Sequence, residues 1–305
     1  MGINTDLILA GIGAAGASGA ELAWFAPPGT TAPTNATTAL TAGVNEQQTI
    51  TITGSPTGGT FTLSYAGQTT AAIPYNATAS AVRSALGALS TIGGTQNITV
   101  SGGPGPATPY VVTFRGALGM ADLAGVTASG SFTGGTSPAI AVTQTTQGAP
   151  GFVSPGLVSE DGLSADLSNS SNDVKAYGLS AVARKIVTDE TTTFKVVFLE
   201  TNPISTSIYN RLPLTGDGAV YPDQNGDWTT TEGQFRAQRY ACVFDLVDGP
   251  NRIRKYCPSA EVTEKDSFTI KAGEAILYGV TLTAYANSAG VSVATFHHVP
   301  ALASA

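Results

Sequence analysis

Charged side chains are almost absent from one long stretch of the chain. Residues 44–148 contain two acidic and two basic residues, namely Glu46, Arg83, Arg115 and Asp122. Surface helices of soluble proteins usually carry charges on their outer faces, so this stretch is not a bundle of helices. Only 11% of all 305 residues are charged, and glycine occurs 36 times. Together these features predict a mainly β protein of short strands joined by Gly, Thr and Ser turns.

The charge-poor stretch has the pattern of a complete small domain. Residues 49–53 (TITIT) and 60–65 (TFTLSY) alternate apolar and polar side chains, as half-buried strands do, and a PTGG turn precedes the second of them. Residues 77–89 have apolar residues at helical spacing behind Asn76, a candidate N-cap. Further strands are predicted at 97–100, 110–114 and 139–142. We predict a β-rich domain with one helix.

The rest of the chain carries the whole net charge of −7, because the four charges of the central stretch cancel. A shift of this kind usually marks a domain boundary. We interpret 44–150 as a domain inserted into a loop of a second, discontinuous domain formed by 1–43 and 151–305. That host domain is predicted to be β-rich as well, with strands at 191–200, 237–247 and 275–285 and one short helix over 204–212, started by Pro203 and followed by Pro213.

Composition argues against several function classes. An acidic chain has no cationic surplus with which to hold phosphate backbones, so sequence-specific nucleic-acid binding is not expected. Cys242 and Cys257 belong to no CxxC or Cys/His cluster, and we interpret them as buried free thiols. Residues 1–6 hold no Lys or Arg, and the apolar run at 7–20 is too short to span a bilayer. We expect synthesis in a cytoplasm and no membrane insertion.

The motifs that suggest catalysis or cofactor binding lack their necessary context. Gly11, Gly13 and Gly16 match G-x-G-x-x-G, but Gly19 interrupts the helix that should follow and no second strand leads to an acidic residue. YPDQNGDW (221–228) lacks the glycine and glutamate positions of a calcium loop. His297 and His298, the only histidines, are adjacent and would point to opposite faces of a strand. We therefore predict no enzyme activity, no cofactor and no metal site.

Several host segments resemble a known family. AWFAPPGTTAPTNATTAL (23–40), GLVSEDGL (156–163), the stretch 172–202 and AEVTEKDSFTIKAGEAILYGVTLTAYAN (260–287) resemble the major tail proteins, or tail tube proteins, of long-tailed (siphovirus-type) phages of actinobacteria. TITGSPTGGTFTLSYAGQTTAAIPYNATASAVRSAL (51–86) resembles a separate family of short modules found in structural proteins of such phages.

The resemblance implies a fold and an assembly. Tail tube subunits are similar to type VI secretion tube proteins: a β-sandwich, or barrel, with one short helix closes into six-membered rings that stack into a tube. The implied partners are further copies of the chain, the tape measure, tail terminator and baseplate or distal tail proteins, and phage DNA that crosses the lumen without specific binding. An acidic or neutral wall suits such a conduit. As candidates for the lumen we name four acidic residues of the host domain: Asp166, Asp173, Asp189 and Glu190.

Ring stacking needs segments that order against a neighbouring ring. Our candidates are the glycine-rich N-terminal arm and the polar loop 215–234, with the residues Gly11, Gly13, Gly16, Asp217, Tyr221, Asp223 and Trp228. The inserted domain would project outward, as passive decoration or as a weak binder of cell-surface glycans. An alternative is an adhesin-like protein of two β domains displayed on a surface, which would purify as a monomer.

Overall fold

The computed structural model describes residues 22–175, 177, 181–216, 218–222, 226–233, 237–267 and 275–300. About 47% of the chain is strand and 9% helix, so the predicted mainly β class is confirmed. The chain divides into two compact units: unit 1 comprises Met1–Leu40, Phe152–Leu212 and Thr231–Ala305, and unit 2 comprises Thr41–Gly151 and Pro213–Thr230. All strand pairs are antiparallel, and none of the described sheets closes into a barrel.

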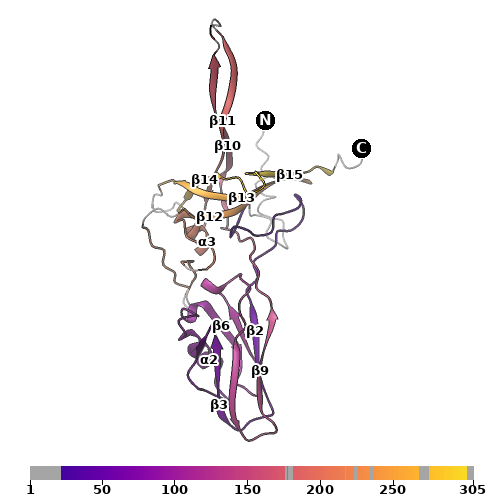
Figure 1. The fold of residues 1–305 in the computed structure, drawn as a ribbon, viewed down its shortest axis with the longest axis vertical. Coiled ribbons are helices and arrows are strands. Elements are labelled where there is room, and N and C mark those ends of the chain that lie inside the picture. The colour runs from indigo at the N-terminus through magenta and orange to yellow at the C-terminus, as the bar shows by residue number, and fades with distance from the viewer. Residues whose placement is uncertain are drawn as a thin grey trace. The chain divides into compact units, whose positions relative to one another are not determined.

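Unit 1 is built on one seven-stranded sheet with the order β1-β12-β13-β14-β11-β10, in which β15 also pairs with β13 (Figure 1). The strands are β1 (Ala23–Ala26), β10 (Val158–Lys175), β11 (Val182–Phe198), β12 (Arg239–Asp248), β13 (Asn251–Lys265), β14 (Tyr278–Ala284) and β15 (Ala294–His298). One edge of β13 pairs first with β15, over Arg252–Tyr256, and then with β14, over Ala260–Lys265. Pro258 lies between the two pairings, at a point where the missing N–H breaks no ladder to either strand.

The main core of unit 1 lies on one face of this sheet. Phe25 of β1 makes edge-to-face contacts with Phe198, Tyr240 and Phe244, at centroid distances of 5.8, 6.1 and 6.3 Å. Phe244 also packs against Phe194 of β11, at 5.0 Å. These large rings are fully buried, and they join strands that are far apart in the sequence.

A second layer covers the opposite face of β12 and β13. Ala26, Phe152, Ala241, Val243 and Tyr256 form a small buried cluster there. Beside it the buried Arg254 makes a bidentate ion pair with Asp245, with both N–O distances 2.6 Å. The same guanidinium donates to the carbonyl oxygens of Asn35, at 3.1 Å, and Thr38, at 2.7 Å. Arg254 therefore connects residues 35–38 to the sheet through hydrogen bonds.

The helix of unit 1 begins where the sequence predicts it. α3 spans Pro203–Tyr209, with a capping box formed by Asn202 and Ser205. It ends before the predicted limit, because Asn210 is the C-cap and Arg211 adopts a positive φ of 56°. Arg211 then donates to the carbonyl oxygens of Val262 and Thr263, which attaches the end of the helix to β13.

Unit 2 contains two small sheets. One has the order β6-β7-β2-β9; in the other, β3 pairs with β8 along one edge and with β4 and β5 along the other. Their bounds are β2 (Gln47–Thr53), β3 (Gly58–Tyr65), β4 (Gln68–Thr69), β5 (Ile73–Pro74), β6 (Ile98–Gly102), β7 (Tyr110–Phe114), β8 (Thr127–Thr133) and β9 (Ala139–Thr146), with short 3-10 turns at Thr95–Asn97 and Gly116–Leu118. The five strands predicted here are confirmed, whereas β4, β5 and β8 were not predicted.

The helix of unit 2, α2 (Ala79–Gly87), packs Val82 and Leu86 into the core between the sheets. The predicted cap, Asn76, is wrong: the side chain of Thr78 accepts the hydrogen bond from the Ala81 N–H. Either residue type can cap a helix, and the chain starts the helix at the position from which Val82 and Leu86 reach the core.

Candidate assembly surface

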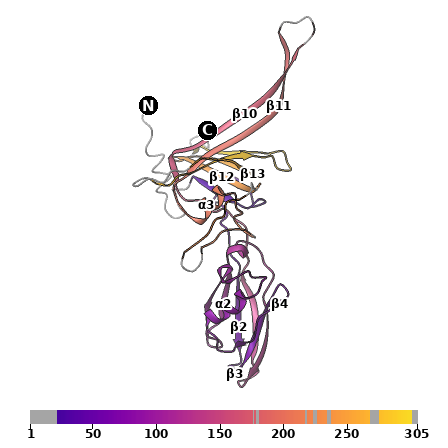
Figure 2. The ribbon, with the colours of Figure 1, turned by 90° about the vertical axis from the view of Figure 1, so that its left-hand side faces the viewer.

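The most unusual feature of unit 1 is the length of its β10–β11 hairpin (Figures 1 and 2). The next strand, β14, pairs with β11 only over Thr192–Phe198. From Thr191 toward the turn the hairpin therefore continues as two strands, with no third described strand beside them. Every described side chain from 164 to 175, and from 181 to 190, is exposed.

We call the described part of residues 168–191 the outer hairpin. It exposes apolar side chains to solvent. Val187 is 59% exposed, and Val174, Val182 and Ile186 are more than 40% exposed. Leu167, opposite Thr192 at the base of the outer hairpin, is 62% exposed. A two-stranded hairpin without a packed face is marginally stable by itself. By the strand register, Leu167 and Val187 share one face of the hairpin, and Val174 and Ile186 lie on the other. The outer hairpin has the properties of a docking element.

The strand register sorts the four predicted lumen residues onto two faces. Asp166 and Ser170 share one face of β10, and Ser170 lies directly opposite Asp189, so Asp166 and Asp189 point the same way. Asp173 points to the other face, and so does Glu190, which lies opposite Asn169. A bulge between Ser170 and Ser171 shifts the register at this point. The structure brings the four residues to one hairpin and separates them into two pairs.

The face with Asp166 is polar along two neighbouring rows of paired residues. One row of directly paired residues crosses five strands and contains Arg239, Glu261, Thr283, Thr193 and Asp166. The next polar row contains Glu264, Thr281, Lys195 and Ser164. We call these two rows the polar face. The row between them lies on the side of the core and is apolar: Val262, Leu282 and Phe194 are buried, and Ala165 ends the row as an exposed residue of the edge strand.

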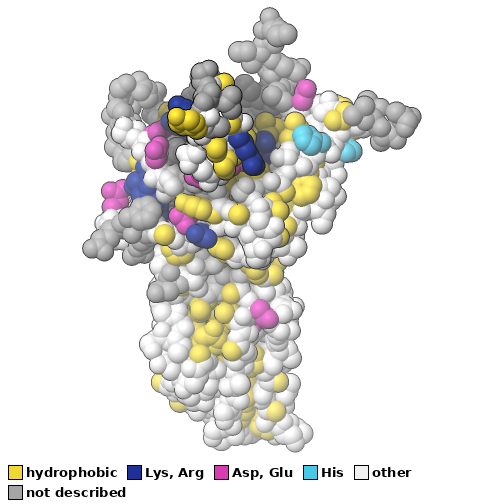
Figure 3. Space-filling model, turned by 45° about the horizontal axis from the view of Figure 1, so that its top comes forward, with side chains coloured by type: hydrophobic (Ala, Val, Ile, Leu, Met, Phe, Trp, Pro, Cys, Tyr) yellow, Lys and Arg dark blue, Asp and Glu magenta, His cyan; other side chains and the backbone are white. Residues whose placement is uncertain are grey.

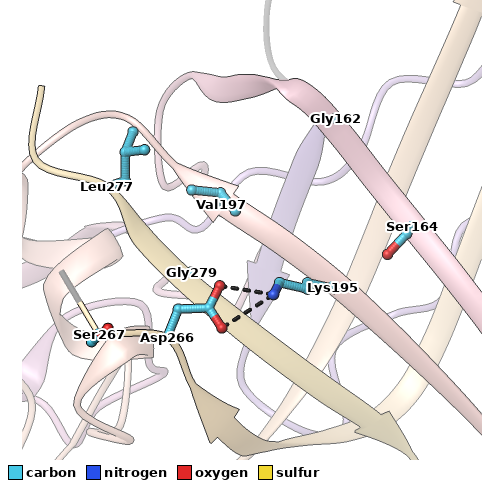
Figure 4. Close-up of a pocket in the computed structure, with 8 residues that line it drawn as sticks. All are labelled: Gly162, Ser164, Lys195, Val197, Asp266, Ser267, Leu277 and Gly279. Atoms are coloured by element: carbon cyan, nitrogen blue, oxygen red, sulfur yellow. Dashed lines mark hydrogen bonds and ion pairs between the residues drawn. The ribbon is translucent and has the colours of Figure 1, made fainter.

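Two cations of the polar face form ion pairs. Lys195 Nζ lies 2.9 Å from Oδ2 and 3.1 Å from Oδ1 of Asp266, the residue that follows the end of β13 (Figure 4). Arg239 Nε lies 2.8 Å from Oε1 of Glu261, and its guanidinium lies 5.0 Å from the centre of the Tyr285 ring. Burial, followed by the charge of Glu261 and a hydrogen bond to it, raises the pKa of Tyr285. Asp166, Asp189 and Glu264 form no ion pair with any described residue.

Lys195 and Asp266 also line an open pocket, together with Gly162, Ser164, Val197, Ser267, Leu277 and Gly279 (Figure 4). The Lys195 ammonium group is held in an ion pair with the Asp266 carboxylate, so it is not available as a nucleophile or as a general base. Among the described residues, no group of three or more His, Cys, Asp or Glu side chains could hold a metal ion. The described lining of the pocket combines this ion pair with two serines, two glycines, a valine and a leucine.

Two of the predicted ring-stacking residues, Tyr221 and Trp228, lie outside the hairpin. Gly11, Gly13, Gly16, Asp217 and Asp223 are outside the described residues. Tyr221 and Trp228 belong to the segment Pro213–Thr230 of unit 2.

This segment is held by hydrogen bonds within unit 2. Tyr221 donates its hydroxyl to the Leu214 carbonyl at 2.7 Å, and burial raises the pKa of Tyr221 to about 12. Arg115 donates to the Pro222 carbonyl at 3.1 Å. Trp228 is partly exposed.

The two cysteines are buried, free and directly opposite each other on β12 and β13. Burial raises the pKa of Cys242 far above its usual value and that of Cys257 to about 12. Both are therefore protonated thiols of low reactivity at neutral pH. His297 and His298 lie on β15, opposite Ile253 and Arg252. None of the described helices has the length and apolar character needed to cross a bilayer.

Sequence reasoning missed the outer hairpin itself. Its first strand contains the polar run SADLSNSSNDVK, which has no period-2 alternation because neither face is buried within the subunit. The second strand does carry a signal: TTTF, rich in β-branched residues, continues backward into VTDE without a glycine or proline.

A family model described as phage tail tube protein matches residues 126–299, which is more than half of the chain. The matched range includes β8 and β9 of unit 2 and all the strands of unit 1 except β1. No curated protein matches the chain.

Proposed function

We propose, from the premise that this chain belongs to the phage tail tube protein family, that it closes into hexameric rings which stack into the tail tube of a siphovirus-type particle. Membership of the family makes it a structural protein of the virion tail that self-assembles. The observation that carries the finer proposal is the outer hairpin, whose exposed apolar residues suit contact with neighbouring copies.

The sheet edges support assembly by strand addition. β10 forms one edge of the unit 1 sheet, since it pairs only with β11 among the described strands. β15 forms another edge, beside β13. Unpaired N–H and C=O groups along an edge strand are a template for a strand from another chain. Edge-to-edge pairing around a ring would complete these ladders and cover Leu167 and Val187.

The polar face suits the wall of a DNA channel. It consists of hydroxyl groups, carboxylates and ion-paired cations, with Asp166 unpaired. Such a surface offers phosphate groups little to bind, so DNA can pass during ejection without specific binding. We assign Asp166 and Asp189 to the lumen, and Asp173 and Glu190 to the face that meets neighbouring subunits.

For the central domain we propose a place on the outside of the tube. It comprises 44–150, inserted into a host domain of 1–43 and 151–305. A lumen that admits a duplex has no room for six further domains of this size. In Figure 3 the coloured charges gather on unit 1 and are sparse on unit 2, in line with the four charged residues of 44–148. Passive decoration and weak glycan contact are both compatible with such a surface.

The proposal names its partners and setting. The tube would contact a tape measure protein inside and the tail terminator and baseplate or distal tail proteins at its ends. The protein would be made in the cytoplasm of an actinobacterial host and then incorporated into the virion.

Electron microscopy of the purified wild-type protein tests the proposal. We expect rings or tubes in negative stain and a high apparent mass in size-exclusion chromatography. A variant in which a short turn replaces residues 168–191 should be folded and monomeric. A monomeric wild type would contradict the proposal and favour the adhesin-like alternative. A helical reconstruction of the tube would show which face lines the bore.

A further inference from the structure

The cations of the polar face raise a problem for a DNA channel. Lys195 and Arg239 have side chains that are 49% and 52% exposed, so both could reach a phosphate. One cation in every subunit would form a ring of cations along the path of the duplex. Each phosphate contact strengthens binding and slows passage by releasing counterions.

We infer that Asp266 and Glu261 act as charge-masking residues, which hold these two cations away from passing DNA. The inference rests on the proposed function, since it assumes that the polar face lines the channel. Asp266 places both carboxylate oxygens within 3.1 Å of Lys195 Nζ. In this geometry the carboxylate competes directly with phosphate for the ammonium group.

The masking of Arg239 has two parts. Glu261 accepts from Nε at 2.8 Å, and its side chain is only 12% exposed, so the pair is partly shielded from solvent. The Tyr285 ring lies 5.0 Å from the guanidinium and covers part of its flat surface. Arg239, whose side chain is 52% exposed, is thereby held by two neighbours.

Three acidic residues on the same side of the sheet do a different job. Asp166, Asp189 and Glu264 form no ion pair with any described residue, so they contribute negative charge without masking a cation. Arg184, near the end of the hairpin and on the same face, also forms no ion pair with the described residues. The masking therefore concerns the body of the sheet, where both exposed cations of the polar face are paired.

Asp266→Asn is the decisive variant, and Glu264→Gln is its matched control. Both remove one negative charge from the same side of the sheet, but only the first frees a lysine. The pair is about half exposed, so its loss should leave the fold intact. The double variant Lys195→Met/Asp266→Asn has the net charge of the wild type and no free lysine.

The measurement is co-sedimentation of a short labelled DNA duplex with tubes assembled from each variant. We expect D266N tubes to retain several-fold more duplex than wild-type tubes at about 50 mM salt, and the difference to vanish by about 200 mM. E264Q and the double variant should behave like the wild type. Equal retention by D266N and E264Q would overturn masking and leave the tube proposal intact. Absence of wild-type tubes would overturn both.

Discussion

Unit 2 and the unit 1 hairpin differ in how completely they bury their own surfaces. The strands of unit 2 enclose a contiguous core, and even its buried polar side chains have partners within the unit. The outer hairpin of unit 1 has no core. Val187 on this hairpin and Leu167 at its base are exposed to solvent. Unit 2 therefore folds around its own buried core, whereas unit 1 has exposed apolar surface that further copies of the chain can bury.

The largest effect is expected from charging the hairpin. Leu167→Asp/Val187→Asp should abolish tube formation, because burying two carboxylates at a subunit contact is far more costly than leaving them in water. The monomer should melt within a few degrees of the wild type, since both side chains are exposed in it. Negative-stain images and thermal melts measure the two outcomes.

Val291→Asp provides the control for this pair. Val291 is also exposed, at 39%, but lies outside the hairpin. Normal tubes from V291D and none from the hairpin variant would sharpen the contrast between hairpin and body. Normal tubes from both would refute the hairpin as a docking element.

The next largest effect concerns the second layer of unit 1. Arg254→Met removes one partner of a buried ion pair and leaves Asp245 and two carbonyl groups without their donor. We expect a loss of about 3–5 kcal/mol in the free energy of unfolding. Denaturant melts measure the loss, and hydrogen exchange should show it in β12, β13 and the segment 35–38.

Arg252→Met is the control, because Arg252 lies on the same strand and is only partly buried. Its effect should stay within about 0.5 kcal/mol. If the Arg254 substitution also lowered the hydrogen-exchange protection of the strands of unit 2, the division into separately stabilised units would be contradicted.

A smaller effect is expected in unit 2 from its buried carboxylate. Glu46 is fully buried and accepts from the Leu123 N–H at 2.6 Å and from the Gln48 side-chain amide at 2.5 Å. Glu46→Ala should cost about 1–3 kcal/mol, because both donors lose their acceptor. Hydrogen exchange should report loosening of 119–126 with no change in unit 1; Asp122→Ala, which alters an exposed carboxylate nearby, should have little effect.

The smallest expected effect tests the corrected helix cap. Thr78→Ala should destabilise unit 2 by about 1 kcal/mol, because the Ala81 N–H loses its acceptor. Asn76→Ala should change the stability by less than about 0.5 kcal/mol. A larger loss from the Asn76 substitution would restore the cap that the sequence predicted.

Strands with one buried face could be predicted from the sequence, and strands with no buried face could not. The strands around Ile50 and Phe61 were predicted because one face of each is buried, which imposes alternation on the sequence. The outer hairpin was missed because neither of its faces is buried in one subunit. The placement of Tyr221 in unit 2 was missed as well, since it depends on a hydrogen bond from Arg115, more than 100 positions earlier in the chain.

The sequence by itself determined the mainly β class, the charge-poor central stretch and the absence of a recognisable catalytic motif, because composition and periodicity record which local surfaces are buried. Only the tertiary structure decided which carboxylates share a face and which cations they neutralise. Those relations depend on the register between distant strands. The bulge that leaves Thr188 without a partner on β10 also changes which face carries Val187, Ile186 and Arg184, and no local pattern specifies that change.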